Sequence, residues 1–305
     1  MESVAAVRPT VGGPIVGSRS DLGVFVRRVL RTRGAGFGLV VTLLTIFLAL
    51  TADVVSPYSP AVQDYTAILS NPTLEHPMGT DNLGRDNLSR IIHGTRVSIQ
   101  AGLVSVGFAT IVGTLMGLAA GYWRGWVDDL LMRLSDALWS FPGIVLALAI
   151  AAALGPGLGN AMIAIGIVYT PIFARLVRGQ VLSVREREFV EAARTIGAGH
   201  ARIMLRHILP NVTAPIVVQV SLSIAFAILS EATLSFLGLG VQPPEPSWGS
   251  MVSRGKDFLD RAPWLAFAPG GAILLAVMGF NFVGDAVRDA LDPRLGRAGR
   301  RGGAS

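Results

Sequence analysis

Residues 191–211 read EAARTIGAGHARIMLRHILPN, a polar stretch in a chain whose other segments are mostly apolar. It combines an acid, several arginines, two histidines, two glycines and a proline. Long apolar runs precede and follow it, and such runs are typical of membrane-spanning helices. The stretch therefore predicts a polar connection between two spans.

The composition supports a membrane protein. The chain has 305 residues, of which 51% are hydrophobic and 15% charged, and its mean hydropathy is +0.55. Soluble domains carry about a quarter charged residues. The net charge of +6 is compatible with nucleic-acid binding. However, the arginines flank apolar runs, which favours a lipid bilayer and no nucleic acid. The absence of cysteine excludes disulfides and thiolate metal sites.

Uncharged runs of at least about 20 residues predict six transmembrane helices and an all-α integral membrane protein. Gly155-Pro156-Gly157 divides one overlong run into the third and fourth spans. A cleaved signal peptide is an alternative for the first span, but residues 1–33 are long for its n-region. The runs lie between Arg33 and Asp53, between Arg96 and Arg124, twice between Asp136 and Arg175, between Arg206 and Glu231, and between Arg261 and Asp285.

The arginines predict the orientation. Most lie in segments that share one side of the membrane, and the positive-inside rule places these segments and both termini in the cytoplasm. The stretch 191–211 is among them. The predicted organisation is a cytosolic extension at 1–33, a first helix at 34–56, an outer segment at 57–96, a five-helix core domain at 97–287 that contains the loop 183–211, and a basic cytosolic tail at 288–305.

Three glycines four residues apart mark the second span. Gly113, Gly117 and Gly121 form a stripe of small residues that allows close helix packing. We expect the partner to be either another span of this chain or a second subunit. The alternative is that glycine is simply common in membrane helices.

The loop pattern predicts two short helices joined by a glycine bend. Ser183 and Glu186 have capping-box spacing, and Gly197 and Gly199 are expected to end the first helix. A second helix is expected over Ala201–Ile208, with Pro210 starting the fifth span. This pattern fits a docking element and a plain connector equally well. The apolar face of the first helix is predicted to hold Val184, Phe189, Ala192, Ala193 and Ile196.

The same residues resemble the EAA loop of bacterial ABC importer permeases. Glu191-Ala192-Ala193 is followed after three residues by Gly197, and nine residues later by a segment that ends in Leu209-Pro210. His207 stands where the general pattern has isoleucine, and HILPN is similar to the peptide-importer subfamily. HPMGTDNLGRDNLSRIIHGTRVSI (76–99) and SEATLSFLGLGVQPPEPSWGSM (230–251) resemble the C-type permease of dipeptide and oligopeptide importers. The resemblance covers nearly the whole chain after the extension.

The resemblance implies a type I ABC importer permease fold in the bacterial inner membrane. Such importers combine two different permeases, two cytosolic ATPase subunits and an external peptide-binding protein. The loop would be the coupling element that contacts an ATPase. Walker A, GxSxG and HExxH motifs are absent from the sequence. We therefore expect no enzyme activity and no bound cofactor, with ATP hydrolysed by the partners. The implied coupling residues are Glu191, Ala192, Ala193, Gly197, His207, Leu209 and Pro210.

Charged residues near the membrane have two interpretations each. Glu231, near the outer end of the fifth span, is a candidate for the translocation path. Equally, it fits a boundary carboxylate held by backbone N–H groups or an arginine. Asp129, Arg133 and Asp136 fall on one helix face and predict a structural ion-pair ladder.

Segment 53–96 is interpreted as an outer loop that contacts the partner permease or the binding protein. The stiff outer loop 243–248 either has the same role or is a rigid connector. Asp81, Asn82, Asp86 and Asn87 suggest calcium, but their spacing does not match an EF-hand, so no metal site is predicted. The alternative functions are import of another cargo, such as nickel chelates, glutathione or sugars, an intramembrane enzyme, or a channel.

Overall fold

The computed structural model describes residues 34–291 together with Val29 and Thr32. The predicted extension over 1–33 and the tail from residue 292 lie almost wholly outside the described residues. Within the described part all regular secondary structure is helical, apart from one β-bridge between Thr80 and Asp86. The elements are α2 (Ala35–Val55), α3 (Asn87–Trp123), α4 (Gly125–Trp139), α5 (Gly143–Leu154), α6 (Leu158–Val184), α7 (Glu188–Thr195), α8 (His200–Arg202), a π-helical turn (Ile203–Ile208), α9 (Leu209–Phe236), α10 (Trp248–Gly255), a 3-10 turn (Lys256–Phe258) and α11 (Trp264–Leu291).

Five helices in the described part are long and apolar enough to cross a membrane, and a bent pair supplies a sixth span. The bent pair is α4 and α5, whose axes differ by 93°. The sequence divided this region only at Gly155-Pro156-Gly157 and did not predict the break between α4 and α5. Pro142 caps α5, and its ring prevents the helix from continuing through it. With 12 residues, α5 is about 18 Å long.

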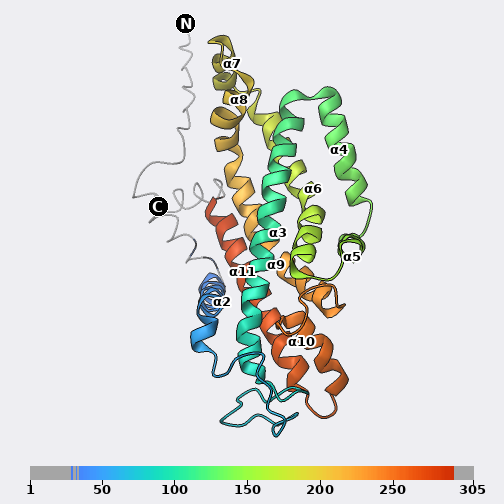
Figure 1. Ribbon diagram of the computed structural model, residues 1–305. Helices are drawn as coiled ribbons and strands as arrows, with labels where there is room; N and C mark the ends of the chain where they lie inside the picture. Colours follow the sequence, from blue (N-terminus) through green and yellow to red (C-terminus); the bar gives the residue numbers. More distant parts are fainter. Residues whose placement is uncertain (1–28, 30–31, 33, 292–305) are drawn as a thin grey trace, which may run out of the picture.

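The bundle has two distinct ends (Figure 1). We call them the α7 end and the α10 end. Helix α3, with 37 residues, is about 55 Å long and connects the two. Ala35 at the start of α2 packs with Ala286 and Ala290 near the end of α11. The end of α2 nearest the N-terminus and the end of α11 nearest the C-terminus therefore lie on the same side of the bundle.

The glycine stripe of α3 packs against α6. A Cβ atom at Gly113 would lie 2.5 Å from the Phe173 Cβ, and one at Gly117 would lie 2.5 Å from the Ala174 carbonyl oxygen. At Gly121 it would lie 2.8 Å from the Val181 Cβ. These distances leave no room for any side chain, so the stripe exists for close packing. Of the two expected partners, another span of this chain is the one found.

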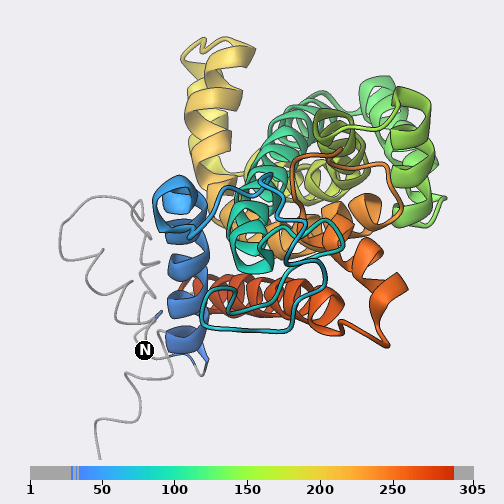
Figure 2. The same ribbon diagram turned by 60° about the horizontal axis from the view of Figure 1, so that its bottom comes forward.

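Segment 56–86 crosses the α10 end of the bundle (Figure 2). Asp86 caps α3 by accepting hydrogen bonds from the Ser89 backbone N–H at 2.7 Å and from the Ser89 hydroxyl at 2.6 Å. Its other oxygen lies 2.9 Å from His76 Nδ1. Because of this cap, α3 begins at Asn87, and residues 87–96, predicted as part of the outer segment, are helical. Of the residues that suggested calcium, Asp81, Asp86 and Asn87 thus have structural partners.

Helices α4 and α6 are joined by ion pairs. Asp128 accepts hydrogen bonds from Arg178 Nε at 2.5 Å and Nη2 at 2.6 Å, and Asp136 pairs with Arg175. The predicted ladder within α4 is wrong, because Asp129 and Arg133 form no ion pair with the described residues. Asp128 and Asp136 are eight residues apart and so return to the face of α4 that contacts α6.

Replacing Asp128 with Asn is expected to lower the free energy of unfolding by about 1–3 kcal/mol, because a two-bond charged pair to Arg178 is lost. Thermal unfolding of the detergent-purified protein measures this. In a double-mutant cycle with Arg178→Gln, we expect a coupling energy above about 0.5 kcal/mol. Asp129→Asn is the control and should be neutral. Equal effects of the two Asn variants would contradict the assignment.

Candidate functional site

Helix α7 occupies one extreme of the molecule (Figure 1). It begins at Glu188, four residues later than expected, because α6 continues to Val184. Ser183 therefore lies inside α6, and the predicted capping box is wrong. The Glu186 carboxylate instead lies 3.0 Å from Arg124 Nη2 and 3.3 Å from Arg185 Nε. Acidic residues in the first turn of α7 and Arg194 in the last match the helix dipole.

The two faces of α7 differ from the predicted ones. Val190 and Ala193 are buried against the core, whose members nearby include Ile203 and Ile208. A neighbouring face exposes Phe189, Ala192 and Ile196, and Ile196 is 85% exposed. Periodicity grouped these residues with Ala193 because an eight-residue helix is too short to resolve neighbouring stripes. The exposed apolar stripe at the end of the molecule is a candidate interaction surface.

Gly197 closes α7 in a left-handed conformation, with φ +80°. Its N–H donates to the Arg194 carbonyl at 2.9 Å, and the Ala198 N–H donates to the Ala193 carbonyl at 3.0 Å. This pair of bonds is a Schellman motif, which favours glycine at this position. No described atom lies within 4 Å of a Cβ built on Gly197. Within this chain, the backbone conformation and not crowding therefore requires the glycine.

The second predicted helix is the start of the next span. From His200 to Phe236 the helix is continuous, so the expected break at Pro210 is wrong. Proline offers no N–H to the carbonyl four residues earlier and crowds it. The chain instead forms a π turn over Ile203–Ile208, in which the Leu209 N–H bonds to the Met204 carbonyl. The π turn widens the helix before Pro210 and lets it continue.

The loop is fastened to the end of α3. The Tyr122 hydroxyl lies 2.8 Å from His200 Nδ1. Arg185 Nη1 donates to the carbonyls of Gly121 and Tyr122 at 3.1 and 2.6 Å. The Arg194 guanidinium lies 5.8 Å from the centre of the Tyr122 ring. Burial is the main cause that lowers the pKa of Arg185, and the charge of nearby Arg124 is the second. Arg185 remains a cation because the ordinary pKa of an arginine is above 12.

The sequence did not identify Tyr122 and Arg185 as site residues. Tyr122 is distant from His200 along the chain, and Arg185 is distant from α3. No spacing pattern connects residues that meet only in three dimensions. The one available signal was that Tyr122 lies in the last turn of the span that carries the glycine stripe.

The predicted coupling residues divide into three groups by exposure. Glu191, Ala192, Gly197 and Pro210 are exposed, whereas Ala193 is buried. The third group is half-buried and consists of His207 in the π turn and Leu209 at the start of α9. The Glu191 side chain forms no ion pair with the described residues, and the His207 carbonyl accepts a hydrogen bond from the Asn211 side chain at 2.7 Å.

Glu231 is fully buried in α9. The Ser235 hydroxyl donates to its Oε1 at 2.6 Å, and Ser98 of α3 is its other polar neighbour. Its Oε2 has no hydrogen-bond partner among the described residues. Neither an arginine nor a backbone N–H group of the described chain holds it. It is therefore an internal carboxyl group between α3 and α9.

The described residues hold no group of three His, Asp or Glu side chains arranged for a metal ion. The candidate functional features within the described bundle are the projecting α7, its contacts with α3, and the buried carboxyl group.

Comparison with known proteins identifies the family. Residues 113–297 match the family described as binding-protein-dependent transport system inner membrane component, and residues 20–72 match the N-terminal TM domain of oligopeptide transport permease C. The dipeptide transport system permease protein DppC of Alkalihalophilus pseudofirmus is 46% identical over 88% of each chain.

Other relatives have different names. The di/tripeptide transport system permease protein DppC of Pseudomonas aeruginosa is 46% identical over 92% of this chain and 94% of that protein. The glutathione transport system permease protein GsiD of Pectobacterium atrosepticum is 44% identical over 89% of this chain and 90% of that protein.

A solved inward-facing structure of the MetNI methionine ABC transporter shares the fold. It aligns with a TM-score of 0.54 over 66% of this chain and 95% of that chain, at 18% identity. The chain belongs to the family of binding-protein-dependent transport system inner membrane components, as an ABC importer permease of the dipeptide and oligopeptide type.

Proposed function

We propose that this chain is one of two permease subunits of a bacterial importer for di- and oligopeptides. Two separate ATPase subunits hydrolyse ATP for it, and an external binding protein delivers the peptide. The observation that carries the proposal is α7, a helix with an exposed apolar stripe that projects from the bundle and is closed by the Schellman motif at Gly197. The relatives named for dipeptides and di/tripeptides support the cargo.

We further propose that the α7 end lies in the cytoplasm, with both chain termini on that side. The ends of α2 and α11 that lie near the chain termini pack together, and the arginine-rich loop between α6 and α9 lies at the α7 end. The positive-inside rule assigns such a loop to the cytoplasm. The chain would then be a multi-pass protein of the bacterial cytoplasmic membrane.

The contacts of α7 suggest how ATP binding would move the spans. The loop is covalently continuous with α6 and α9, and Tyr122 and Arg185 connect it to α3. A displacement of α7 by an ATPase would therefore act on three long helices at once. Rigid elements of this kind pass a rigid-body motion between two arrangements of a bundle.

Docking through α7 is tested by co-purification of the ATPase subunits with the full-length permease pair. Replacing Phe189 and Ile196 together with Glu should remove the ATPase subunits and dipeptide uptake while membrane levels stay unchanged. Val62→Glu, an exposed apolar position in segment 56–86, is the control. Normal ATPase recovery with the double variant would refute docking through this stripe.

Tyr122→Phe is expected to reduce peptide uptake per ATP hydrolysed by several-fold, because only the hydroxyl contact to His200 is lost and such a bond contributes about 1 kcal/mol. Uptake and ATP hydrolysis are measured together in proteoliposomes. Tyr65→Phe, which removes an exposed hydroxyl bonded to Gln63, should leave the ratio unchanged. A fall in hydrolysis and uptake by the same factor would indicate a purely structural role.

Glutathione is a second candidate cargo, since GsiD relatives of two organisms are similar along nearly the whole chain. Specificity in such a system would reside in the binding protein. Titration of the binding protein encoded beside this permease with dipeptides and with glutathione separates the two cargoes. Preference for glutathione would replace the peptide proposal and leave the architecture unchanged.

For Glu231 we favour an internal structural role over the translocation path, because its side chain is covered by α3 and α9. Glu231→Gln keeps an acceptor for the Ser235 hydroxyl, so uptake is expected to stay within about twofold of wild type. Radiolabelled dipeptide uptake measures this. A tenfold loss at normal membrane levels would restore a path role.

A further inference from the structure

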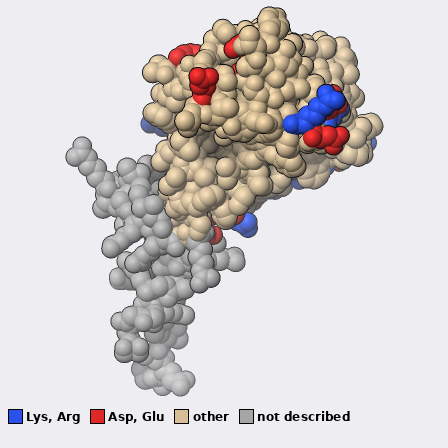
Figure 3. Space-filling model, turned by 90° about the horizontal axis from the view of Figure 1, so that it is seen from below, with Lys and Arg blue, Asp and Glu red and all other residues tan. Residues whose placement is uncertain are grey.

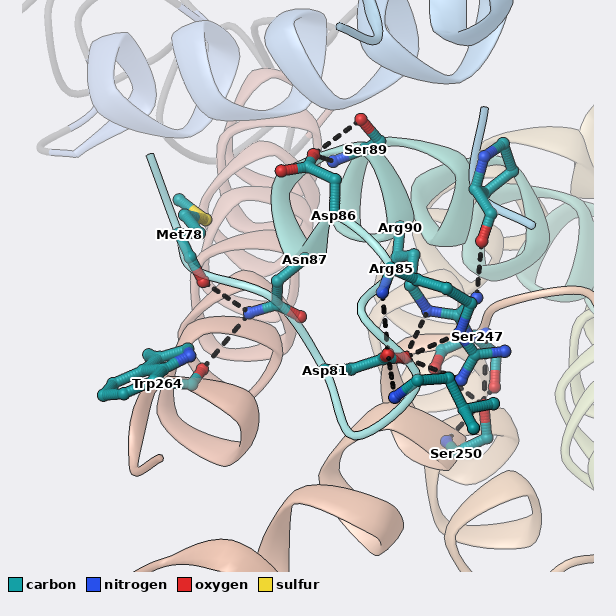
Figure 4. Close-up of polar contacts among 12 residues, drawn as sticks. Met78, Asp81, Arg85, Asp86, Asn87, Ser89, Arg90, Ser247, Ser250 and Trp264 are labelled. Atoms are coloured by element: carbon teal, nitrogen blue, oxygen red, sulfur yellow. Dashed lines mark hydrogen bonds and ion pairs between the residues drawn. The ribbon is translucent and has the colours of Figure 1, made fainter. Parts of the chain in front are cut away.

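A cluster of arginines lies at the α10 end, around a single carboxylate (Figure 4). Asp81 accepts hydrogen bonds from Arg85 Nε at 2.7 Å, and Arg85 Nη2 lies 2.6 Å from Asp81 Oδ2. Arg90 Nε lies 3.7 Å from the same oxygen. Arg254 of α10 is the third guanidinium group within electrostatic reach of Asp81. The side chains of Arg85 and Arg90 are almost fully buried.

The guanidinium group of Arg90 has only part of its N–H groups in hydrogen bonds. Arg90 Nη1 donates to the Pro60 carbonyl at 2.7 Å, whereas Nη2 is buried without a hydrogen-bond partner among the described residues. Arg254 forms no ion pair within the described chain. Burial is the main cause that lowers the pKa of Arg254, and repulsion from Arg85 is the second. The negative charge of Asp81 raises this pKa.

The charges do not balance. Three guanidinium groups share one carboxylate, and Asp86, the next acidic residue, is occupied by the α3 cap and His76. Buried charges without partners are costly, and proteins normally pair them. A further anion would compensate the excess.

A small cavity lies between the guanidinium groups of Arg90 and Arg254. It has a volume of about 20 Å³ and is lined by Asp81, Asn82, Arg90 and Arg254, with Met251 and Phe258 as apolar wall. This volume admits about one water-sized group, the size of a single carboxylate oxygen. Arg254 is half-buried at this site. Few charged side chains are visible on the surface when the molecule is seen from below (Figure 3).

We propose that this cavity binds a carboxylate group between Arg90 and Arg254. Guanidinium groups recognise carboxylates through paired N–H donors. The carboxylate belongs either to the transported peptide or to an acidic side chain of the external binding protein. This choice of source, unlike the site itself, rests on the proposed function.

The site is tested by adding sodium acetate to the purified full-length permease pair. The buffer has a low anion concentration and contains no gluconate. Acetate should raise the Tm saturably, by about 2–4 °C near saturation. Arg254→Gln should abolish the shift, and Arg261→Gln, an exposed arginine on the same side, should keep it. An equal or non-saturable shift in wild type and Arg254→Gln would overturn the site.

Arg254→Glu provides a second test that does not depend on acetate affinity. This variant supplies its own carboxylate beside Arg90, so its Tm without acetate should equal or exceed that of wild type and should not respond to acetate. A Tm below that of wild type would overturn the proposal. Both measurements omit ATP and peptide, so they remain valid if the proposed transport function fails.

The source is then identified in proteoliposomes by comparing a dipeptide with its C-terminal amide. If the peptide supplies the carboxylate, wild type should prefer the free acid and Arg254→Gln should lose the preference. If the binding protein supplies it, Arg254→Gln should weaken stimulation of ATP hydrolysis by the loaded binding protein equally for both peptides. Unchanged behaviour in both assays would overturn a role of the site in transport.

Discussion

Leucine at Gly117 is expected to prevent α3 from packing on α6. A Cβ atom there would lie 2.5 Å from the Ala174 carbonyl oxygen and 2.7 Å from the Val177 Cβ. These are a backbone atom and the stem of a side chain, so neither can rotate away. Overpacking typically costs about 1–3 kcal/mol, and a whole leucine at a helix contact is expected to exceed that range. Membrane levels and the folded fraction in detergent chromatography should both fall sharply.

Gly107→Ala is the matched control for this prediction. Gly107 lies on the same helix, and its added Cβ would have no neighbour within 4 Å. Alanine there should leave stability unchanged or raise it by up to about 1 kcal/mol through helix propensity. A stable Gly117→Leu protein would show that α3 and α6 do not pack as described.

Valine at Gly197 is expected to reduce peptide uptake by at least about tenfold while the protein remains folded in the membrane. The residue has φ +80°, where a β-branched side chain costs about 1–3 kcal/mol. The strain would open the Schellman motif and displace the end of α7, which carries Ile196. Dipeptide uptake and ATPase co-purification are measured in the same membranes.

Two variants separate backbone strain from the loss of a contact. Asn tolerates the left-handed region, so Gly197→Asn should retain most of the uptake. Gly199→Asp should also be tolerated, because Gly199 has φ −67° at the start of α8, a position that accepts Asp. If Gly197→Asn fails as completely as valine, close approach by an ATPase subunit, and not conformation, requires the glycine.

The sequence by itself determined the features that depend on local composition. Runs of apolar residues located every long helix, because a bilayer core of fixed thickness sets the length of a span. The stripe at Gly113, Gly117 and Gly121 predicted close packing, and Gly197 predicted the end of α7. The EAA spacing identified the family, since those residues are neighbours along one loop.

Only the tertiary structure decided which distant residues meet and where regular helices break. It selected α6 as the partner of the glycine stripe, paired Asp128 with Arg178, and placed Tyr122 beside His200. It bent the third span at Pro142 and continued the fifth through Pro210. Periodicity describes one helix at a time, whereas these outcomes depend on the surface of another helix and on backbone groups supplied by remote segments.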